Sequence, residues 1–317
     1  MAGQREVAVA PAGPRLDVGK IWRALLARAP IHVAVIGLVV VWSIPTIALL
    51  VSSFRDPGLV VTSGWWRAIA DPLEFTIDNY ETVLDRQGMG QSFVNSLIIT
   101  IPSTFLVILV AAFAAYAFAW MRFPFRNALF LIVVALLVVP LQMTLIPILR
   151  LYVNVNENFS FLGNEVPLMG GRIFGTNSFL GIWLAHTAFG LPFAVYLLRN
   201  FFGGLPRDLF ESAYMDGASD LAVFFRIVLP LSMPAIAALT IFQFLWVWND
   251  LLIALVLLGD PDMAPMTLTI TNLVSSFGTA YQLLTAAAFI SMALPLLIFF
   301  ALQRYFVQGI LAGAVKG

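Results

Sequence analysis

Residues 94–120 read VNSLIITIPSTFLVILVAAFAAYAFAW and contain no charged side chain. A helix needs about 20 consecutive, mostly apolar residues to cross the hydrocarbon core of a bilayer. This run exceeds that length, and it lacks the strict apolar–polar alternation that is typical of a transmembrane β-strand. The stretch therefore predicts a transmembrane helix.

The composition of the whole chain supports the same conclusion. Of its 317 residues, 61% are apolar or aromatic and 11% are charged, whereas about 25% of the residues of an ordinary soluble domain are charged. The chain has no cysteine, which excludes a disulfide scaffold and a thiolate metal site. Its 17 basic and 17 acidic residues cancel, so the basic excess of a nucleic-acid-binding protein is missing. We expect an all-α integral membrane protein.

Six stretches of the chain are long and apolar enough to cross the membrane as helices. They are residues 31–53, 94–120, 128–149, 179–198, 235–258 and 283–302. The 30 residues before them contain Pro11, Pro14 and several glycines and alanines, a composition that favours a disordered tail. We therefore expect a disordered tail over residues 1–30 and one domain of six transmembrane helices over residues 31–317.

The lysines and arginines are distributed unevenly between the two sides of the membrane. If the N-terminus is cytoplasmic, twelve of them lie on the cytoplasmic side and five on the other side. Because short cytoplasmic loops carry an excess of Lys and Arg, we expect both termini in the cytoplasm. Three external segments result, at residues 55–91, 150–178 and 259–282, and the first carries Trp65 and Trp66 at positions typical of interfacial anchors.

The loop between the fourth and fifth spans, residues 201–234, contains a short amphipathic helix. Pro206 suits the start of a helix, and Gly217 suits the left-handed position just past a helix end. At 100° per residue, an apolar face of Leu209, Phe210, Ala213 and Tyr214 opposes a face of Asp208, Glu211, Ser212, Met215 and Asp216. Ser219 can cap a second helix, which Pro230 ends or kinks. By amphipathicity alone, this helix could equally be a surface connector between two spans.

Three motifs carry a resemblance to a known family. The loop reads ESAYMDGA from Glu211 and IVLPLSMP over residues 227–234. The fifth span reads QFLWVWND over residues 243–250, and the C-terminus from Gln303 reads QRYFVQGILAGAVKG. These motifs resemble the signature of permease subunits in bacterial ABC importers. The match is to the carbohydrate-importing branch, which includes the shorter permease of the maltose system and α-glucoside permeases.

The resemblance covers residues 92–317 well and the first span loosely. It implies that the helix at residues 206–217 is a cytoplasmic coupling helix, which docks into a cleft on a separate ATPase subunit. The residues that it assigns to this contact are Arg207, Asp208, Glu211, Ser212, Ala213, Asp216 and Gly217. Ser212 stands where the family usually has alanine, and its side chain is still small enough for a tight groove.

The same resemblance implies a set of partners in a prokaryotic inner membrane. They are a second permease subunit, two ATPase subunits and an extracellular or periplasmic solute-binding protein. ATP and magnesium would bind in the ATPase, so we expect this chain to bind no cofactor and to catalyse no reaction. Its own nearest match to a phosphate-binding loop, Gly170–Gly175, is followed by Thr176 where that motif requires lysine.

Asp250 is the only acidic residue well inside a predicted span. Ionisable residues at such depth are costly, and they usually face a cavity or a partner. Asp250 could line the solute pathway together with Gln243 and Asn249, whose amides can bond to sugar hydroxyls, or it could pair with another helix and hold the bundle together. The sequence leaves both interpretations open. His32 and His186 lack the spacing of a metal site, and we expect them to be structural.

Two other classes of function compete with the importer subunit. A stand-alone secondary transporter or channel for a small polar solute would fit the composition, but the sequence shows no inverted repeat. A membrane-embedded enzyme would need paired carboxylates, a zinc motif or a nucleophile–base pair, and the spans contain none. The resemblance favours an oligosaccharide or α-glucoside as substrate, with a polyol or a sugar phosphate as alternatives. The long external loop at residues 150–178 bears on that choice.

Overall fold

The computed structural model describes residues 18–71, 74–158, 175–276 and 280–314, and their regular structure is helical apart from one isolated β-bridge between Arg55 and Phe75. The chain divides into two compact units, Met1–Val51 and Ser52–Gly317. Five predicted features lie partly outside the described residues: the N-terminal tail at 1–17, the three external segments at 72–73, 159–174 and 277–279, and the C-terminal motif at 315–317.

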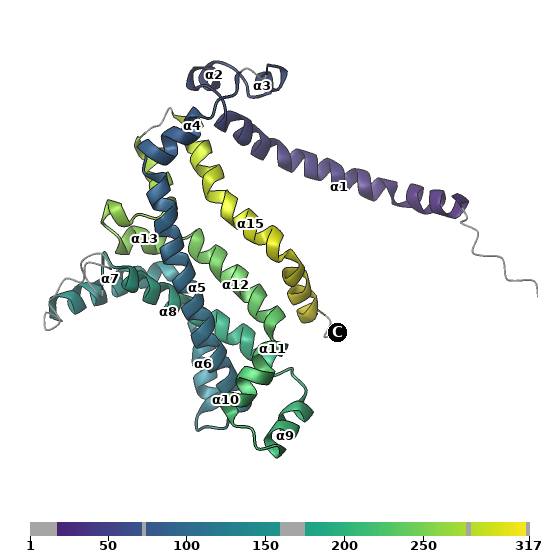
Figure 1. The fold of residues 1–317 in the computed structure, drawn as a ribbon, viewed down its shortest axis with the longest axis vertical. Helices are drawn as coiled ribbons and strands as arrows, with labels where there is room; N and C mark the ends of the chain where they lie inside the picture. Colours follow the sequence, from purple (N-terminus) through teal and green to yellow (C-terminus); the bar gives the residue numbers. More distant parts are fainter. Residues whose placement is uncertain (1–17, 72–73, 159–174, 277–279, 315–317) are drawn as a thin grey trace, which may run out of the picture. The chain divides into compact units, whose positions relative to one another are not determined.

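Figure 1 shows the helices in chain order. They are α1 (Val18–Ser53), α2 (Pro57–Thr62), α3 (Trp66–Ala70), α4 (Asp78–Glu81), η2 (Thr82–Arg86), α5 (Met89–Trp120), α6 (Arg126–Leu136), α7 (Leu141–Asn158), α8 (Phe179–Phe202), α9 (Arg207–Met215), α10 (Asp220–Val223), η5 (Phe224–Val228), α11 (Leu229–Leu231), α12 (Met233–Trp248), α13 (Leu252–Leu257), η6 (Pro261–Met263), α14 (Met266–Ser276) and α15 (Tyr281–Ala314). The elements η2 and η5 are π-helical turns, and η6 is a 3₁₀ turn.

The first unit consists, in its described part, of most of helix α1. This helix begins at Val18, so residues 18–30 of the predicted disordered tail are helical instead. The apolar residues 31–42 are all exposed within the chain. A long helix that is apolar around its whole circumference is typical of a membrane span.

Four helices of the described chain are long and apolar enough to cross a membrane. They are residues 29–53 of α1, all of α5, all of α8 and residues 281–301 of α15. Two further pairs qualify only when taken together: α6 with α7, bent by 102°, and the stretch Asp220–Leu231 with α12, bent by 75°. The protein is therefore an all-helical, multi-pass membrane protein with four to six spans, and the count of six stays a prediction.

Two of the predicted spans are not continuous helices. The third span, expected over residues 128–149, breaks between Leu136 and Leu141, because Pro140 offers no backbone N–H and its ring excludes the helical conformation from the residue before it. The fifth span, expected over residues 235–258, ends as a helix at Trp248 and resumes as α13 at Leu252, after three intervening residues.

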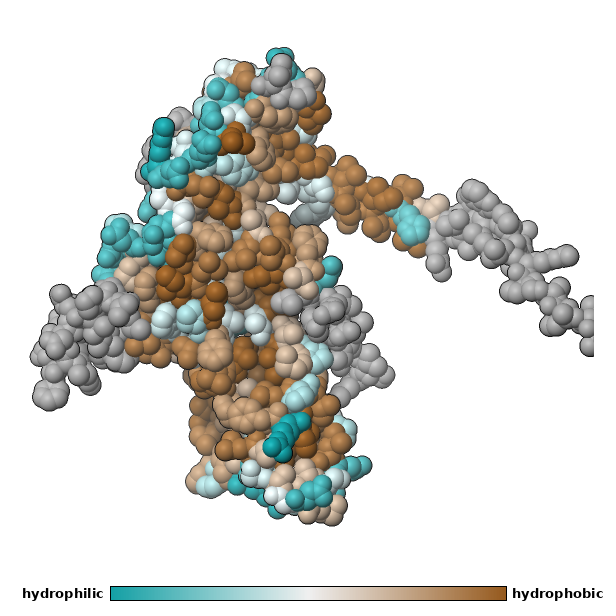
Figure 2. All heavy atoms as spheres, in the orientation of Figure 1, coloured by the Kyte–Doolittle hydropathy of each residue, from teal (hydrophilic) through white to brown (hydrophobic). Residues whose placement is uncertain are grey.

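The core of the second unit is built around α5, which packs along α8 and also against α12. The buried face of α5 repeats small side chains at helical spacing: Ser96, Ser103, Ala111 and Ala115. Small residues let two membrane helices approach closely, where packing contacts are the main attraction between them. Figure 2 shows the complementary exterior, with apolar side chains predominating over the middle of this unit and hydrophilic ones gathering toward its ends.

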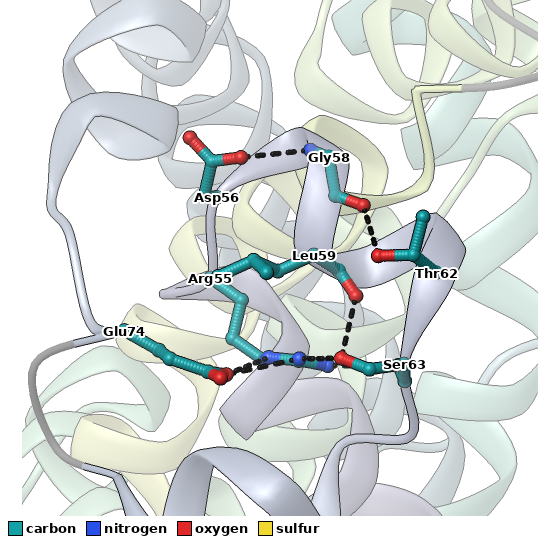
Figure 3. Close-up of polar contacts among 7 residues, drawn as sticks. All are labelled: Arg55, Asp56, Gly58, Leu59, Thr62, Ser63 and Glu74. Carbon is teal, nitrogen blue, oxygen red and sulfur yellow. Dashed lines mark hydrogen bonds and ion pairs between the residues drawn. The ribbon is translucent and has the colours of Figure 1, made fainter.

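The segment after α1 is organised around a buried arginine (Figure 3). Arg55 is 1% exposed, and its guanidinium donates to the Glu74 carboxylate at 3.0 and 3.2 Å and to the carbonyl oxygen of Ser63 at 3.1 Å. The Asn79 amide donates to the carbonyl oxygens of Ser53 and Arg55. A buried charge is tolerated when it is paired and hydrogen-bonded in this way. These bonds give the predicted external segment a defined fold.

Candidate functional site

Helix α9 is delimited by the residues that the sequence singled out. It begins at Arg207, directly after Pro206, and Gly217 adopts the left-handed conformation with φ of 78°. The N–H of Gly217 bonds to the carbonyl oxygen of Tyr214 at 3.1 Å, and the N–H of Ala218 bonds to that of Ala213 at 3.0 Å. This pair of bonds is the Schellman motif, which satisfies the last carbonyl groups of a helix and suits glycine at the left-handed position.

One side of α9 is anchored to the Trp120 end of α5 by an aromatic stack. Phe210 is 2% exposed, and its ring lies 3.6 Å from the Trp120 ring with an interplanar angle of 17°. The indole N–H of Trp120 donates to the carbonyl oxygen of Phe202 at 2.9 Å, so the same tryptophan also reaches the end of α8. Stacked aromatic pairs contribute about 0.5–1.5 kcal/mol beyond the burial of their area. Phe210 is therefore the main attachment of α9.

A chain of three polar side chains adds a second attachment. The Tyr214 hydroxyl donates to the Asp220 carboxylate at 2.8 Å, and it lies 3.3 Å from the Tyr116 hydroxyl of α5. Burial raises the pKa of Tyr214, and its hydrogen bonds with Tyr116 and Asp220 raise it further. The phenol of Tyr214 therefore keeps its proton at physiological pH and remains a hydrogen-bond donor. Ser219 caps α10 as predicted, since its hydroxyl accepts from the N–H of Ala222.

The opposite side of α9 is exposed and polar. The exposed residues that the sequence assigned to ATPase contact are Arg207, Asp208, Glu211, Ser212, Asp216 and Gly217, whereas Ala213 is partly buried. Within the described chain, the charged side chains of this set have no hydrogen-bond or ion-pair partner. We call this surface, made of Asp208, Glu211, Ser212, Met215 and Asp216, the polar face of α9.

The predicted division of α9 into two faces is correct for Phe210 but incomplete for its neighbours. Leu209 and Tyr214, expected on the inner face, are both about two-fifths exposed. Met215 is 82% exposed, and Leu221 and Phe225 are also exposed. Large apolar side chains gathered on a surface mark a contact with another protein or with lipid. No role was predicted for Met215, although its position on the polar face could have indicated one.

Gln243 faces the packed interior of the second unit. It lies on α12, is 2% exposed and has an Nε2 atom without a hydrogen-bond partner among the described residues. Its amide approaches Gly190 of α8 so closely that a Cβ atom at Gly190 would lie 2.7 Å from Nε2 and 2.9 Å from the Val107 side chain. Glycine at position 190 therefore makes the space that the buried amide occupies.

Asp250 lies at the break between α12 and α13, not within a continuous helix. Its Oδ2 atom accepts from the backbone N–H of Ile253 at 3.0 Å and lies 3.9 Å from Nε2 of His186 on α8. Its backbone carbonyl oxygen accepts from the Thr267 hydroxyl at 2.7 Å. The carboxylate thus caps the first turn of α13, as short acidic side chains do at helix starts.

The three pathway candidates of the fifth span do not share one environment. Gln243 is buried between helices, Asn249 is exposed and Asp250 is occupied by the cap of α13. The Asn249 amide donates to the carbonyl oxygen of Leu245 at 2.7 Å, one turn back on its own helix. The sequence-based prediction missed this separation, because it placed all three residues on one continuous helix over residues 235–258.

A bundle of apolar helices, with a short polar-faced helix between two of its spans, defines a multi-pass membrane protein. The chain belongs to the family of binding-protein-dependent transport system inner membrane components, which matches residues 92–312. It is therefore an inner membrane component of a transport system, as the resemblance in its motifs implied.

Two relatives match nearly the whole chain. The chain is 53% identical to the osmoprotective compounds uptake permease protein GgtD of Synechocystis sp., over 91% of this chain and 92% of that protein. It is 40% identical to the α-glucoside transport system permease protein AglG of Rhizobium meliloti, over 90% of this chain and 97% of that protein.

The fold has a counterpart among solved structures. A chain of a bacterial ABC transporter involved in the import of the acidic polysaccharide alginate superimposes with a TM-score of 0.60. That comparison covers 90% of this chain and 98% of the other, at 18% sequence identity. At this identity, the likeness establishes a shared fold.

Proposed function

We propose that the chain is the permease subunit of an ATP-driven importer of sugars and that α9 docks onto a separate ATPase subunit. The observation that carries the proposal is the asymmetry of α9. Phe210 fixes one side to the bundle, while the polar face presents charged side chains that have no partner among the described residues. Relatives named for α-glucoside and arabinooligosaccharide transport support a neutral sugar as the solute.

The proposed assembly contains this chain, a second permease subunit, two ATPase subunits and a solute-binding protein. A solved structure of the alginate transporter is a complex with a periplasmic protein that holds an alginate pentasaccharide, which supports a binding protein as a partner here. ATP and magnesium would bind in the ATPase subunits. In this arrangement α9 and both termini lie in the cytoplasm.

The contacts of α9 provide a route for coupling. When two ATPases close on ATP, a docked α9 moves with them. Because Phe210 stacks on Trp120 of α5, and Tyr214 bonds to Asp220 at the start of α10, the displacement reaches two spans directly. Helix α5 packs along α8, so these helices would move as a rigid group, in the manner of the switching transitions known for packed domains.

The pathway candidates take different roles in this proposal. Gln243 and Asn249 are the candidates for solute contact, since the Gln243 amide nitrogen has no hydrogen-bond partner in the described part of the chain and Asn249 is exposed. Asp250 is the candidate for a structural role, because its carboxylate caps α13 and its carbonyl oxygen binds Thr267. Both assignments follow from the contacts of each side chain.

The proposal is tested by co-purification from detergent-solubilised native membranes. The tagged wild-type chain should recover an ATPase and a second permease, and the complex should take up sugar only with ATP. Glu211→Lys should recover the second permease without the ATPase and should abolish uptake, because reversing a charge in a desolvated interface costs about 2–5 kcal/mol or more.

The matched control is Glu81→Lys, the same substitution at an exposed glutamate of α4. It should leave the recovered ATPase unchanged. A wild-type chain that came out alone and moved solute in vesicles without ATP would replace the importer with a secondary transporter. Full recovery of the ATPase by Glu211→Lys would move the docking surface away from the polar face of α9.

A further inference from the structure

A cavity with both polar and apolar walls opens at the Met89 end of α5, opposite the end that carries α9. Its volume is about 400 Å³, which lies within the 300–1,000 Å³ range of small-molecule sites. The walls come from three segments that are distant in sequence: the start of α5 with Gln87 and Gln91, the loop at residues 258–264, and α14 with Asn272. We call it the α5–α14 cavity.

The backbone wall of the cavity is held by buried side chains. The Asn95 amide of α5 donates to the carbonyl oxygens of Asp262 at 2.8 Å and Ala264 at 3.1 Å. The Ser96 hydroxyl accepts from the N–H of Met266 at 2.9 Å. Bonds across about 170 residues of sequence thus fix the loop, and a preformed wall binds a ligand without first losing conformational entropy.

A third side chain secures the other end of the loop. Asn177, which precedes α8, adopts a left-handed φ of 54° and accepts through its Oδ1 atom from the N–H groups of Gly259 at 2.5 Å and Asp260 at 3.1 Å. Asparagine tolerates this conformation better than most residues. The loop is therefore tied to α5 at one end and to the start of α8 at the other.

The polar side chains that line the cavity include hydroxyls, amides and carboxylates. The hydroxyls of Ser92 and Thr269 are hydrogen-bonded to each other at 2.6 Å in its wall. Around them, the amides of Gln87 and Asn272 and the carboxylate of Asp262 have no side-chain partner within the described chain. Amides offer both donors and acceptors, and a carboxylate forms strong, charge-assisted bonds with hydroxyl donors.

The charge of the lining restricts the class of ligand. Among the described residues that line it, Asp260 and Asp262 are acidic, and there is no lysine, arginine or aromatic residue. Two carboxylates without a cation disfavour anionic solutes such as uronates and sugar phosphates. Quaternary ammonium compounds are recognised by aromatic cages, which this lining lacks. Leu268 and Leu273 leave apolar surface for a carbon skeleton.

We infer that the α5–α14 cavity is a binding site for a neutral polyhydroxylated solute on this subunit. The inference rests on the proposed function, and it adds a location and a charge preference. With α9 in the cytoplasm, the cavity opens on the external side, where a solute arrives before it crosses.

The inference is tested on the assembled transporter, without its binding protein, in lipid nanodiscs. Ligand-observed NMR measures the affinity for the neutral probes sucrose, trehalose and maltose, and for glucuronate as an anionic probe. At least one neutral probe should bind, and glucuronate should bind more weakly. Asn272→Leu should weaken binding of the neutral probe about 2- to 10-fold, which is the value of one lost neutral hydrogen bond.

A second variant tests the charge preference. Asp262→Asn keeps the shape of the side chain and removes one charge, so glucuronate should gain affinity about 2- to 10-fold relative to the neutral probe. Thr62→Val, a change at an exposed residue of α2 outside the cavity, is the control and should leave both affinities unchanged. Unaltered binding in both Asn272→Leu and Gln87→Leu would overturn the inference.

Two further results separate this inference from the proposed function. If Asn272→Leu weakened attachment of the solute-binding protein while sugar binding to the nanodiscs stayed the same, the cavity would be a protein docking surface, and the inference would be wrong. If the wild-type assembly with its binding protein showed no ATP-driven sugar uptake, the proposed function would be wrong. That result would not depend on whether the assembly in nanodiscs bound a sugar.

Discussion

The two ends of α5 each hold a segment that is distant in sequence, by opposite means. At the Trp120 end, α9 is attached through its own side chains, Phe210 and Tyr214. At the Met89 end, the loop at residues 258–264 is attached through its backbone, which receives hydrogen bonds from Asn95. A segment held by a few side chains can move as a body, whereas a segment held along its backbone keeps its shape.

This difference matches the two roles proposed for the segments. Helix α9 would move with an ATPase, and its attachment is one aromatic stack and one chain of hydroxyl bonds. The loop would present a fixed wall to a solute. Because its backbone is what holds it in place, exposed side chains such as that of Asp262 remain available to bind a solute. Variants that remove each kind of attachment should therefore have different effects.

The largest effect is expected from Phe210→Ala. Truncating a buried phenylalanine to alanine costs about 3–5 kcal/mol of stability. In this protein the lost stability is that of the contact between α9 and α5. Hydrogen exchange should show loss of protection in the amides of α9, while α5 and α8 keep theirs, because local opening depends on local contacts. Leu209→Ala, on the same helix but two-fifths exposed, is the control. Equal protection in both variants would mean that the stack on Trp120 does not anchor the helix.

A smaller but more widespread effect is expected from Asn95→Leu. The change leaves the carbonyl oxygens of Asp262 and Ala264 without their donor, and each unsatisfied buried group costs about 1–3 kcal/mol. The thermal midpoint of the purified chain in detergent should fall, and exchange should increase across residues 258–266. Thr240→Val, which removes a hydroxyl bond within its own helix, should lower the midpoint less. If the increase in hydrogen exchange were confined to α5, Asn95 would not be what holds the loop.

The smallest effect is expected from Tyr214→Phe. The variant loses a hydrogen bond to Asp220 at a half-exposed site, which is worth about 1 kcal/mol or less. Because the pKa of Tyr214 lies above its usual value of about 10, the phenol stays protonated below that pH, and the bond is lost only as the pH rises beyond it. The protection factors of the α9 amides, which correct for the intrinsic pH dependence of amide exchange, should therefore fall slightly and by the same ratio at about pH 6 and about pH 8. Tyr196→Phe on α8 is the control, and a loss of protection that differs markedly between the two pH values would contradict the assignment.

The sequence predicted correctly those helices and helix ends whose geometry depends only on residues adjacent in the chain. The apolar runs marked α5 and α8, and Pro206, Gly217 and Ser219 marked the bounds of α9 and the start of α10. Each of these signals acts through the backbone within about one turn, so it can be read without knowing the rest of the fold. The family motifs were equally local, and they predicted the family to which the chain belongs.

The breaks in two spans and the exposure of individual side chains were not predicted, because they depend on contacts between residues that are distant in the sequence. The length of an apolar run does not reveal a break inside it, so the bend at Pro140 and the cap formed by Asp250 changed two predicted spans. The exposure of Tyr214 was missed because helical periodicity assumes that a whole face is covered.

By itself, the sequence determined that this protein lies in a membrane, where the short helix α9 begins and ends, and that this helix carries a polar face. Tertiary structure alone decided that Trp120 covers Phe210, that Asp250 caps α13, and that Asn95 shapes a cavity with residues about 170 positions away. The reason is physical: backbone preference is set by adjacent residues, whereas burial and hydrogen-bond partners are set by how distant helices pack.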